Sequence, residues 1–471
     1  MKKHYETHVE DTDKLISVAG PVLDYKSWYE QYRKLMEEQA QRKYGLYTPT
    51  SEGDEDDFPS IPGMIARYSA KDLTNEQMAT NPVWVDKTGN EHDLQMKNFA
   101  WKEGSGISDV YPGFILGDGV DDFAVTEKEL NFEDTYTVYT AFIPFQDDPA
   151  RNMILCGKND TKDFSINYSG THLNFKPSTD VNLAVRIDQF ALLVCKRNKD
   201  ITTIINLSTG ESRSLKSVEF ISNPGLYYLW RNMFATFHAR AAIAGQTICN
   251  GYFSTDEDDK KVLDWYKKQM PWLFPDQAWT VVGKTNEDED RATIANITGN
   301  GNDLILSNFG FVEGSGYNEE GEYAGYLVTD GVDDKVVSKQ FKFGENFTVI
   351  LDFKFPVKKI SYCGFDLSAK VRIQNFQGSG VYVVLKGNKT LIPSNVVRAV
   401  TSEGKVYDEN WNEYNIVPGN ISSNYTMVNL GFDGSNQFAE SATKLAGIYS
   451  STLSKDDCIK AYNYLQTLKA K

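Results

Sequence analysis

The sequence has 471 residues, of which 41% are hydrophobic and 13% aromatic, so roughly two to four domains with buried cores are expected. A formal net charge of -16 argues against nucleic-acid binding, which needs a clustered basic surface, and against an anionic membrane as partner. The five cysteines are too widely spaced for a metal-binding CxxC pair, so we predict buried free thiols in a protein made in a reducing compartment.

The first 50 residues are predicted to form a helical docking or oligomerisation segment. Residues 25–45 are rich in Glu, Gln, Lys and Arg and contain no proline. One helical face carries four apolar side chains at steps of three, four and three residues, namely Tyr25, Trp28, Tyr32 and Leu35. A short helix does not bury such a stripe by itself, so these four are the candidate partner-docking residues. The alternative is that the helix folds back on the first domain.

The segment that follows, residues 51–63, reads as a linker because it contains five acids and two prolines. The N-terminus has two lysines without an apolar run after them, which excludes the pattern of a secretory signal peptide. No stretch approaches the ~20 apolar residues of a membrane-spanning helix. The sequence therefore predicts a soluble protein that is not inserted in a membrane.

Beyond the linker the sequence repeats itself. Residues 89–106 align with residues 299–316, at an offset of 210, and residues 111–122 align with residues 323–334, at an offset of 212. Matches in the same order at nearly constant spacing indicate a duplicated domain.

Each copy is predicted to be a mostly β, antiparallel sandwich of the jelly-roll kind. Apolar and polar side chains alternate in residues 349–355, which is typical of a half-buried strand. β-rich runs separated by turn residues occur in both copies, as in sandwiches and jelly rolls. The predicted domains are residues 64–272 and residues 273–471.

Both copies end in a predicted helix. Ser254 and Glu257 in the first copy, and Ser454 and Asp457 in the second, have the spacing of a capping box. An apolar stripe in the second helix is predicted to pack on the rim of its sandwich and consists of Cys458, Ala461, Leu465 and Leu468.

The order of these motifs resembles that of concanavalin A-like lectin/glucanase domains of the laminin-G-like kind. The resemblance rests on a repeated Asp-Gly-Val-Asp-Asp unit beside a strand and on the closing residues 445–465. Residues 282–317 are also similar to repeats in structural proteins of crAss-like and other phages that infect Bacteroides-type bacteria.

These resemblances imply a virion protein made in the host cytoplasm and acting as a head or tail fibre, decoration or adaptor. Its implied partners are other virion proteins, further copies of itself and host surface polysaccharide. A bacterial glycan-binding protein is the alternative, and a glycoside hydrolase of the same superfamily is the third reading.

Several members of the superfamily are glucanases, so the acids decide whether an enzyme is expected. Retaining glycosidases of this fold place two acids on alternate positions of one strand, ~5–5.5 Å apart. No such pattern falls on an apolar-interleaved stretch, because the acids of residues 286–292 lie in a polar run. The histidines are isolated from one another and are His4, His8, His92, His172 and His238. The prediction is therefore a protein that is not an enzyme.

The Asp-Gly-Val-Asp-Asp unit offers carboxylates that could bind calcium, which takes six to eight oxygen ligands. The residues concerned are Asp118, Asp121 and Asp122 in the first copy, and Asp330, Asp333 and Asp334 in the second. Each set directly precedes a strand, where Asp-Gly favours a turn and short acids cap local amides. We therefore expect these acids to stabilise the turn, and no cofactor is predicted. Calcium binding by the same acids is the alternative.

A sugar-binding site on such a sandwich would also use an aromatic platform. Trp101 and Phe311 occupy matching positions in the two copies and fit a core role equally well. Trp230 and Trp411 lie in the diverged halves. The sequence selects no glycan-binding residue among them.

Overall fold

The computed structural model divides the chain into two compact units, Met1–Asp57 and Phe58–Lys471. The predicted docking residues Tyr25, Trp28, Tyr32 and Leu35 lie outside the described residues, as do His4 and His8. The structure describes residues 57–145, 153–158, 164–169, 172–176, 181–217, 225–231, 238–355, 363–368, 370–375, 381–420, 425–432 and 438–470.

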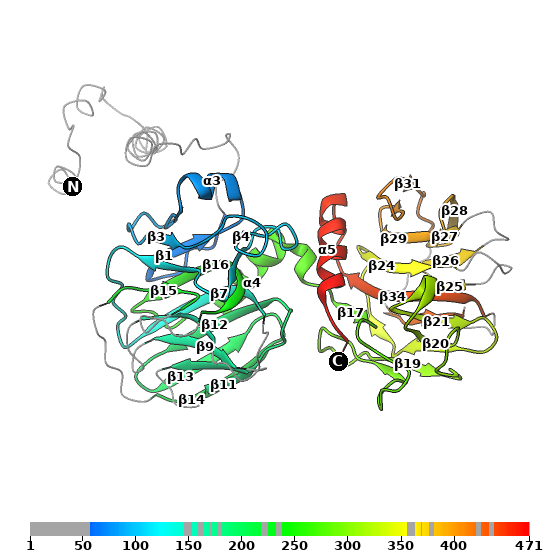
Figure 1. The fold of residues 1–471 in the computed structure, drawn as a ribbon, viewed down its shortest axis with the longest axis horizontal. Coiled ribbons are helices and arrows are strands. Elements are labelled where there is room, and N and C mark those ends of the chain that lie inside the picture. Colours follow the sequence, from blue (N-terminus) through cyan, green and yellow to red (C-terminus); the bar gives the residue numbers. More distant parts are fainter. Residues whose placement is uncertain are drawn as a thin grey trace, which may run out of the picture. The chain divides into compact units, whose positions relative to one another are not determined.

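The first sandwich consists of two antiparallel sheets, each with eight strands among the described residues (Figure 1). One sheet has the order β14-β13-β12-β7-β16-β5-β4, with β1 also paired to β16. The other has the order β11-β10-β9-β8-β15-β6-β3-β2. The strands of the first sheet are β1 (Met64–Ser69), β4 (Gly106–Ile107), β5 (Ile115–Asp118), β7 (Tyr136–Pro144), β12 (Ala191–Arg197), β13 (Ile201–Asn206), β14 (Glu211–Lys216) and β16 (Arg240–Asn250). Those of the second are β2 (Val83–Trp84), β3 (Leu94–Lys97), β6 (Phe123–Thr126), β8 (Met153–Gly157), β9 (Ser165–Ser169), β10 (His172–Lys176), β11 (Val181–Ala184) and β15 (Tyr228–Leu229).

The second sandwich repeats this plan, with sheets in the order β20-β21-β34-β24-β29-β30-β31, to which β17 is added beside β34, and β18-β19-β22-β33-β25-β26-β27-β28. The first of these sheets contains β17 (Gln277–Thr280), β20 (Gly316–Asn318), β21 (Tyr326–Asp330), β24 (Thr348–Lys354), β29 (Val396–Thr401), β30 (Lys405–Tyr407), β31 (Glu413–Asn415) and β34 (Glu440–Tyr449). The second contains β18 (Thr293–Ile294), β19 (Leu304–Ser307), β22 (Lys335–Ser338), β25 (Cys363–Leu367), β26 (Val371–Asn375), β27 (Val381–Leu385), β28 (Asn388–Ile392) and β33 (Val428–Leu430). A short pair, β23 (Phe341–Lys342) and β32 (Tyr425–Thr426), lies outside both sheets.

The helical elements are few among the described residues, and the predicted mostly β, two-sandwich fold is confirmed. They are α3 (Asn75–Thr80), α4 (Asp256–Gln269), η2 (Pro271–Leu273), η3 (Gly321–Tyr323) and α5 (Lys455–Thr467). None of these helices combines the length and apolar character needed to cross a membrane.

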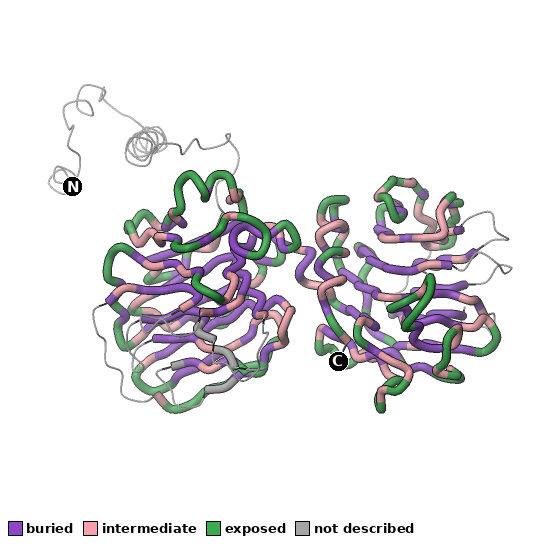
Figure 2. The backbone as a smooth tube through the Cα atoms, in the orientation of Figure 1, coloured by how far each residue is buried: buried purple, intermediate pink, exposed green. Residues whose placement is uncertain are grey.

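The core of each sandwich lies between its two sheets, since buried positions follow the strands while many connections are exposed (Figure 2). In the first sandwich, Val138 of β7 and Leu173 of β10 belong to one fully buried cluster, although they come from opposite sheets. Val349 of β24 and Ile373 of β26 do the same in the second. All five cysteines are buried, and none of them forms a disulfide, which confirms that part of the sequence prediction.

The two copies fill the same space in the core with a side chain from different positions. Trp230 of the first copy is fully buried, and a Cβ on Gly117 would lie only 2.4 Å from its ring. At the corresponding places of the second copy stand Thr329 and Gly431, and a Cβ on Gly431 would lie 2.7 Å from the Thr329 side chain. Both Trp230 and Gly431 have positive φ, 61° and 77°. The space is filled once from the loop and once from the strand, so Trp230 is a core residue rather than a sugar platform.

The closing helix of the first sandwich is attached by a buried ion pair. The Lys196 ammonium of β12 lies 2.8 Å from the Asp259 carboxylate of α4, and both side chains are 5% exposed. The hydroxyls of Tyr139 and Ser254 also donate to Asp259, at 2.9 and 2.7 Å. Because this carboxylate has three donors, its burial is compensated.

The second closing helix uses a different acid for the same purpose. Asp352 of β24 is 2% exposed and pairs with Arg398 of β29. The Tyr462 hydroxyl and the Gln466 amide of α5 donate to the same carboxylate, at 3.1 and 2.7 Å. Burial raises the pKa of Asp352, but the Arg398 charge and hydrogen bonds from Tyr326, Arg398 and Gln466 outweigh it and hold this pKa below its usual range.

The helix caps agree with the sequence prediction in one copy and differ by one residue in the other. Ser454 caps α5 and accepts the backbone N–H of Asp457 at 3.1 Å, as predicted, while its hydroxyl donates to the Asp457 carboxylate at 2.8 Å in place of the reciprocal backbone bond of a capping box. The predicted cap at Ser254 and Glu257 is wrong, because Thr255 caps α4 together with Asp258. The helix begins one residue later, where the Thr255 hydroxyl accepts the backbone N–H of Asp258 at 3.2 Å, and the buried Ser254 hydroxyl donates to Asp259.

The predicted apolar stripe of α5 is buried, but it does not pack on a rim. Its residues are 0–2% exposed and belong to a cluster that includes Ile350 of β24 and Leu445 of β34. The helix therefore covers the outer face of a sheet. The stripe consists of Cys458, Ala461, Leu465 and Leu468.

The same apolar cluster continues from one sandwich into the other. Trp272 of η2 is 1% exposed and contacts Phe114 of the first sandwich and Tyr464 of α5, with ring centroids 6.4 and 5.8 Å apart. The Tyr464 hydroxyl accepts the backbone N–H of Phe190 at 3.1 Å. Residues 58–471 form one compact unit, and the boundary drawn between residues 272 and 273 stays a prediction.

Candidate functional site

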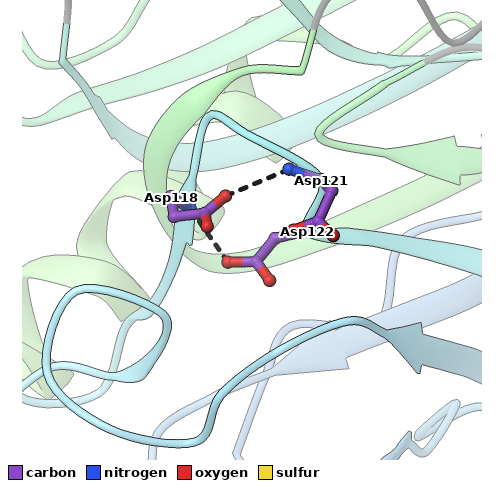
Figure 3. Close-up of side chains that lie close together, drawn as sticks. All are labelled: Asp118, Asp121 and Asp122. Atoms are coloured by element: carbon purple, nitrogen blue, oxygen red, sulfur yellow. Dashed lines mark hydrogen bonds between the residues drawn. The ribbon is translucent and has the colours of Figure 1, made fainter.

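The Asp-Gly-Val-Asp-Asp unit of the first copy is the turn between β5 and β6. Oδ1 of Asp118 accepts the backbone N–H groups of Val120 at 2.7 Å and Asp121 at 3.3 Å. The Asp122 carboxylate accepts the backbone N–H of Asp118 at 2.9 Å. Gly119 has φ +77°, the left-handed conformation that favours glycine. Figure 3 shows the carboxylates of Asp118 and Asp122 turned to these backbone groups.

The second copy repeats this geometry closely. Oδ1 of Asp330 accepts the N–H groups of Val332 and Asp333, at 2.7 and 3.4 Å. Asp334 accepts the N–H of Asp330 at 2.9 Å, and Gly331 has φ +73°. In both copies two of the three acids therefore organise the turn itself, which supports the structural reading of the motif.

A cation could still use these acids, since one carboxylate oxygen from each lies within 4.8 Å of the other two in both copies. The carboxylates of Asp118 and Asp122 are, however, already acceptors of two and one backbone N–H groups. The calcium alternative stays a prediction.

Two further repeated motifs converge on the turn. Asn98 and Asn308 both have φ +68°, and their side-chain amides donate at 3.0 Å to the carbonyls of Asp121 and Asp333. Ser315 donates to Asp334 at 3.1 Å. The Asn-Phe and Gly-Ser-Gly repeats thus serve the same turn. Their joint retention in both copies was the signal for it.

The second acid of each pair is buried, and its protonation is perturbed. Asp122 is 0% exposed and Asp334 is 1% exposed. Burial raises the pKa of each to about 6, while hydrogen bonds from the turn and from Ser105 or Ser315 act in the opposite direction. Each turn therefore holds an acid that titrates near pH 6.

An aromatic and cationic cluster lies beside the turn of the first copy. The Arg231 guanidinium lies 3.6 Å from the centre of the Phe123 ring, and the His238 imidazole stacks on that ring at 6.4 Å. An imidazole N–H of His238 also bonds to the carbonyl of Val120. His238 is isolated from the other histidines in the sequence, so this contact could not be predicted.

The second copy has an equivalent cluster in which the cation and the aromatic ring have changed places. Lys335 stands where the first copy has Phe123, and its ammonium lies 5.7 and 5.4 Å from the rings of Phe432 and Phe438. Those two rings stack with centroids 6.1 Å apart. A cation–aromatic contact holds the same junction in both copies.

The tips of both turns are apolar and exposed. Val120 is 72% exposed and Val332 is 66% exposed. Trp101 and Phe311 are half-buried, have φ +52° and +51°, and pack against their cores. Trp411 is also half-buried, against rings of the cluster that includes α5. The exposed valines are therefore more available to a partner than these aromatic side chains.

Two asparagines at matching places in the copies bind backbone groups of a neighbouring strand. Asn286, which opens the acidic run at residues 286–292, holds the backbone of Tyr317 through two bonds of 2.8 Å. Asn75 does the same for Ile107 in the first copy, with bonds of 2.9 and 2.7 Å. The backbone N–H of His92 donates to Asp86 at 3.3 Å.

No protein-family model matches the sequence, and no curated protein matches it. Solved structures similar to the chain include the Trypanosoma rangeli sialidase in complex with sialic acid, at 10% identity and a TM-score of 0.34, covering 52% of this chain. The chain spans 40% of the length of that sialidase. The binding domain of botulinum neurotoxin serotype D/C VPI 5993 is similar at 9% identity and a TM-score of 0.38, covering 81% of this chain and 98% of that domain.

One prediction is corrected by this comparison. The expectation that the chain is not an enzyme is wrong as it was made, because sialidases are among the solved structures similar to it. The TM-scores lie below 0.5, so none of these similarities assigns an activity or a ligand to this chain. The β-sandwich part of the resemblance stands on the structure itself.

Proposed function

We propose that the chain is a display protein of a phage particle. Residues 1–57 attach it to other virion proteins or to further copies of itself, and the sandwich pair at residues 58–471 presents its turns to the surface of the host cell. The ligand class that we propose for those turns is host surface polysaccharide.

The observation that carries this proposal is the division of the chain at Asp57/Phe58. The predicted stripe of Tyr25, Trp28, Tyr32 and Leu35 falls in one unit and the complete sandwich pair in the other. Attachment and presentation can therefore be separated along the chain. The exposed tips at Val120 and Val332 supply two equivalent presenting surfaces.

Substitution of the stripe in the full-length chain tests the attachment. Trp28→Ala with Tyr32→Ala should abolish incorporation into particles and reduce the oligomer measured by light scattering, while the unfolding temperature of the sandwiches stays unchanged. The matched control is Glu30→Ala with Glu37→Ala, which lies on the opposite face of the same predicted helix. Incorporation that survives the first pair of changes contradicts the attachment role.

Binding to polysaccharide is tested separately. The full-length chain is titrated into purified surface polysaccharides of the host by calorimetry, and Val120→Asp with Val332→Asp should weaken binding. Reducing ends are measured in the same mixtures, which reports cleavage by the chain. Unchanged binding by the double variant excludes the turn tips as the contact.

A further inference from the structure

His238 joins two elements of the first sandwich that are distant in the sequence. It lies two residues before β16 and bonds through one ring nitrogen to the carbonyl of Val120, in the β5–β6 turn. Its ring stacks on Phe123 with an interplanar angle of 27°. Among the described residues the other ring nitrogen, Nε2, is buried and has no hydrogen-bond partner. This arrangement suits a neutral imidazole, because a neutral ring has one N–H to donate and that proton is used.

The groups that face His238 come from three elements. Arg231 follows β15 and contacts the Phe123 ring of β6, and Asp118 and Asp121 belong to the turn. Burial lowers the pKa of His238, Arg231 lowers it further, and the bond to Val120 and the two acids raise it. Protonation would add a second N–H without an acceptor and a second cation near Arg231. Both changes cost free energy in the closed contact.

The second sandwich lacks this group at the equivalent position. Phe438 stands there, bridged to Phe432, and the cation of the cluster is Lys335. The buried acids, in contrast, are shared by both copies, as Asp122 and Asp334. At this junction the first sandwich therefore has an imidazole where the second has a phenyl ring.

We propose that His238 makes the contact between the acidic turn and the start of β16 proton-sensitive, so that acidification loosens this junction in the first sandwich and not in the second. The neutral ring holds the Val120 carbonyl, and the protonated ring leaves its place between Phe123 and the turn. The two presenting surfaces of one chain then respond differently to the same acid environment.

Hydrogen exchange in the full-length chain at pH 7 and pH 5, corrected for the intrinsic pH dependence of exchange, tests the proposal. Relative to peptides covering residues 329–338, peptides covering residues 117–126 should lose protection by up to about tenfold for each pH unit below the ordinary imidazole pKa of about 6.5. Protonation of the buried acids Asp122 and Asp334, whose pKa is raised to about 6, strengthens both turns on acidification, so this effect cancels in the comparison. Equal responses of the two turns would overturn the proposal.

Two exchanges between the copies sharpen the test. His238→Phe should remove the acid response of the first turn, and Phe438→His should introduce one in the second. A first turn that still opens in the His238→Phe variant would falsify the role of the imidazole. If that variant does not fold, the Phe438→His variant decides alone, since an unresponsive second turn also contradicts the proposal.

Discussion

Replacing Asp334 by asparagine should stabilise the protein at neutral pH, which reverses the usual outcome for a buried hydrogen-bonded residue. Asp334 is 1% exposed, and burial raises its pKa to about 6, against about 3.9 in an unfolded chain. The folded state therefore binds this proton more tightly than the unfolded state. The stability that the group contributes is complete below pH ~3.9 and is lost as the pH rises through about 6.

The magnitude follows from the size of the shift. Roughly two pKa units at 1.36 kcal/mol each give about 3 kcal/mol, at most, as the cost of the ionised carboxylate at pH 7. Asparagine keeps an oxygen for the Asp330 N–H, now 2.9 Å from the carboxylate, and places an amide opposite the Ser315 hydroxyl. The unfolding temperature at pH 7 should rise by roughly 6–12 °C for a cooperative unit of about 200 residues.

Thermal unfolding of the wild type and the Asp334→Asn variant between pH 4 and pH 8 measures this effect. The difference between the two curves should vanish near pH 4 and grow through pH 6. Asp333→Asn is the matched control, since it removes an exposed carboxylate from the same turn. The reasoning is refuted if Asp334→Asn destabilises at pH 7, or if its effect is the same at every pH. Asp122 is less suitable, because the lowered pKa of His238 gives a contribution of opposite sign in the same sandwich.

Two further substitutions test the packing. Lys196→Met leaves the Asp259 carboxylate buried without its cation and should lower the free energy of unfolding in urea by about 3–5 kcal/mol. Asp259→Leu should restore most of this loss in the double variant. An unchanged midpoint for Lys196→Met contradicts the role of the pair. Gly117→Thr places a Cβ 2.4 Å from the Trp230 ring and should cost about 1–3 kcal/mol. Adding Trp230→Gly reproduces the threonine–glycine pair of the second copy and should restore part of the lost stability. If the double variant is less stable than Gly117→Thr alone, the two pairs do not fill equivalent spaces.

The duplication, the two β-sandwiches and the turn at Asp-Gly-Val-Asp-Asp could all be predicted from the sequence. These features depend on spacing and on residues close together in the chain, such as the bond from Val120 to Asp118 two positions away. The cap of the second closing helix at Ser454 belongs with them, because its partner is three residues on. Local rules of this kind need no knowledge of the rest of the molecule.

The contacts made by the diverged halves could not be predicted in this way, because they depend on the tertiary structure. Trp230 fills the space above Gly117, and Lys196 pairs with Asp259, 63 residues further along. His238 reaches a turn more than a hundred residues before it. Two side chains that share such a contact must fit each other in size. The first copy therefore pairs Trp230 with Gly117, and the second pairs Gly431 with Thr329. No pattern within a short stretch of sequence records that exchange, because the space being filled exists only after the two sheets have packed.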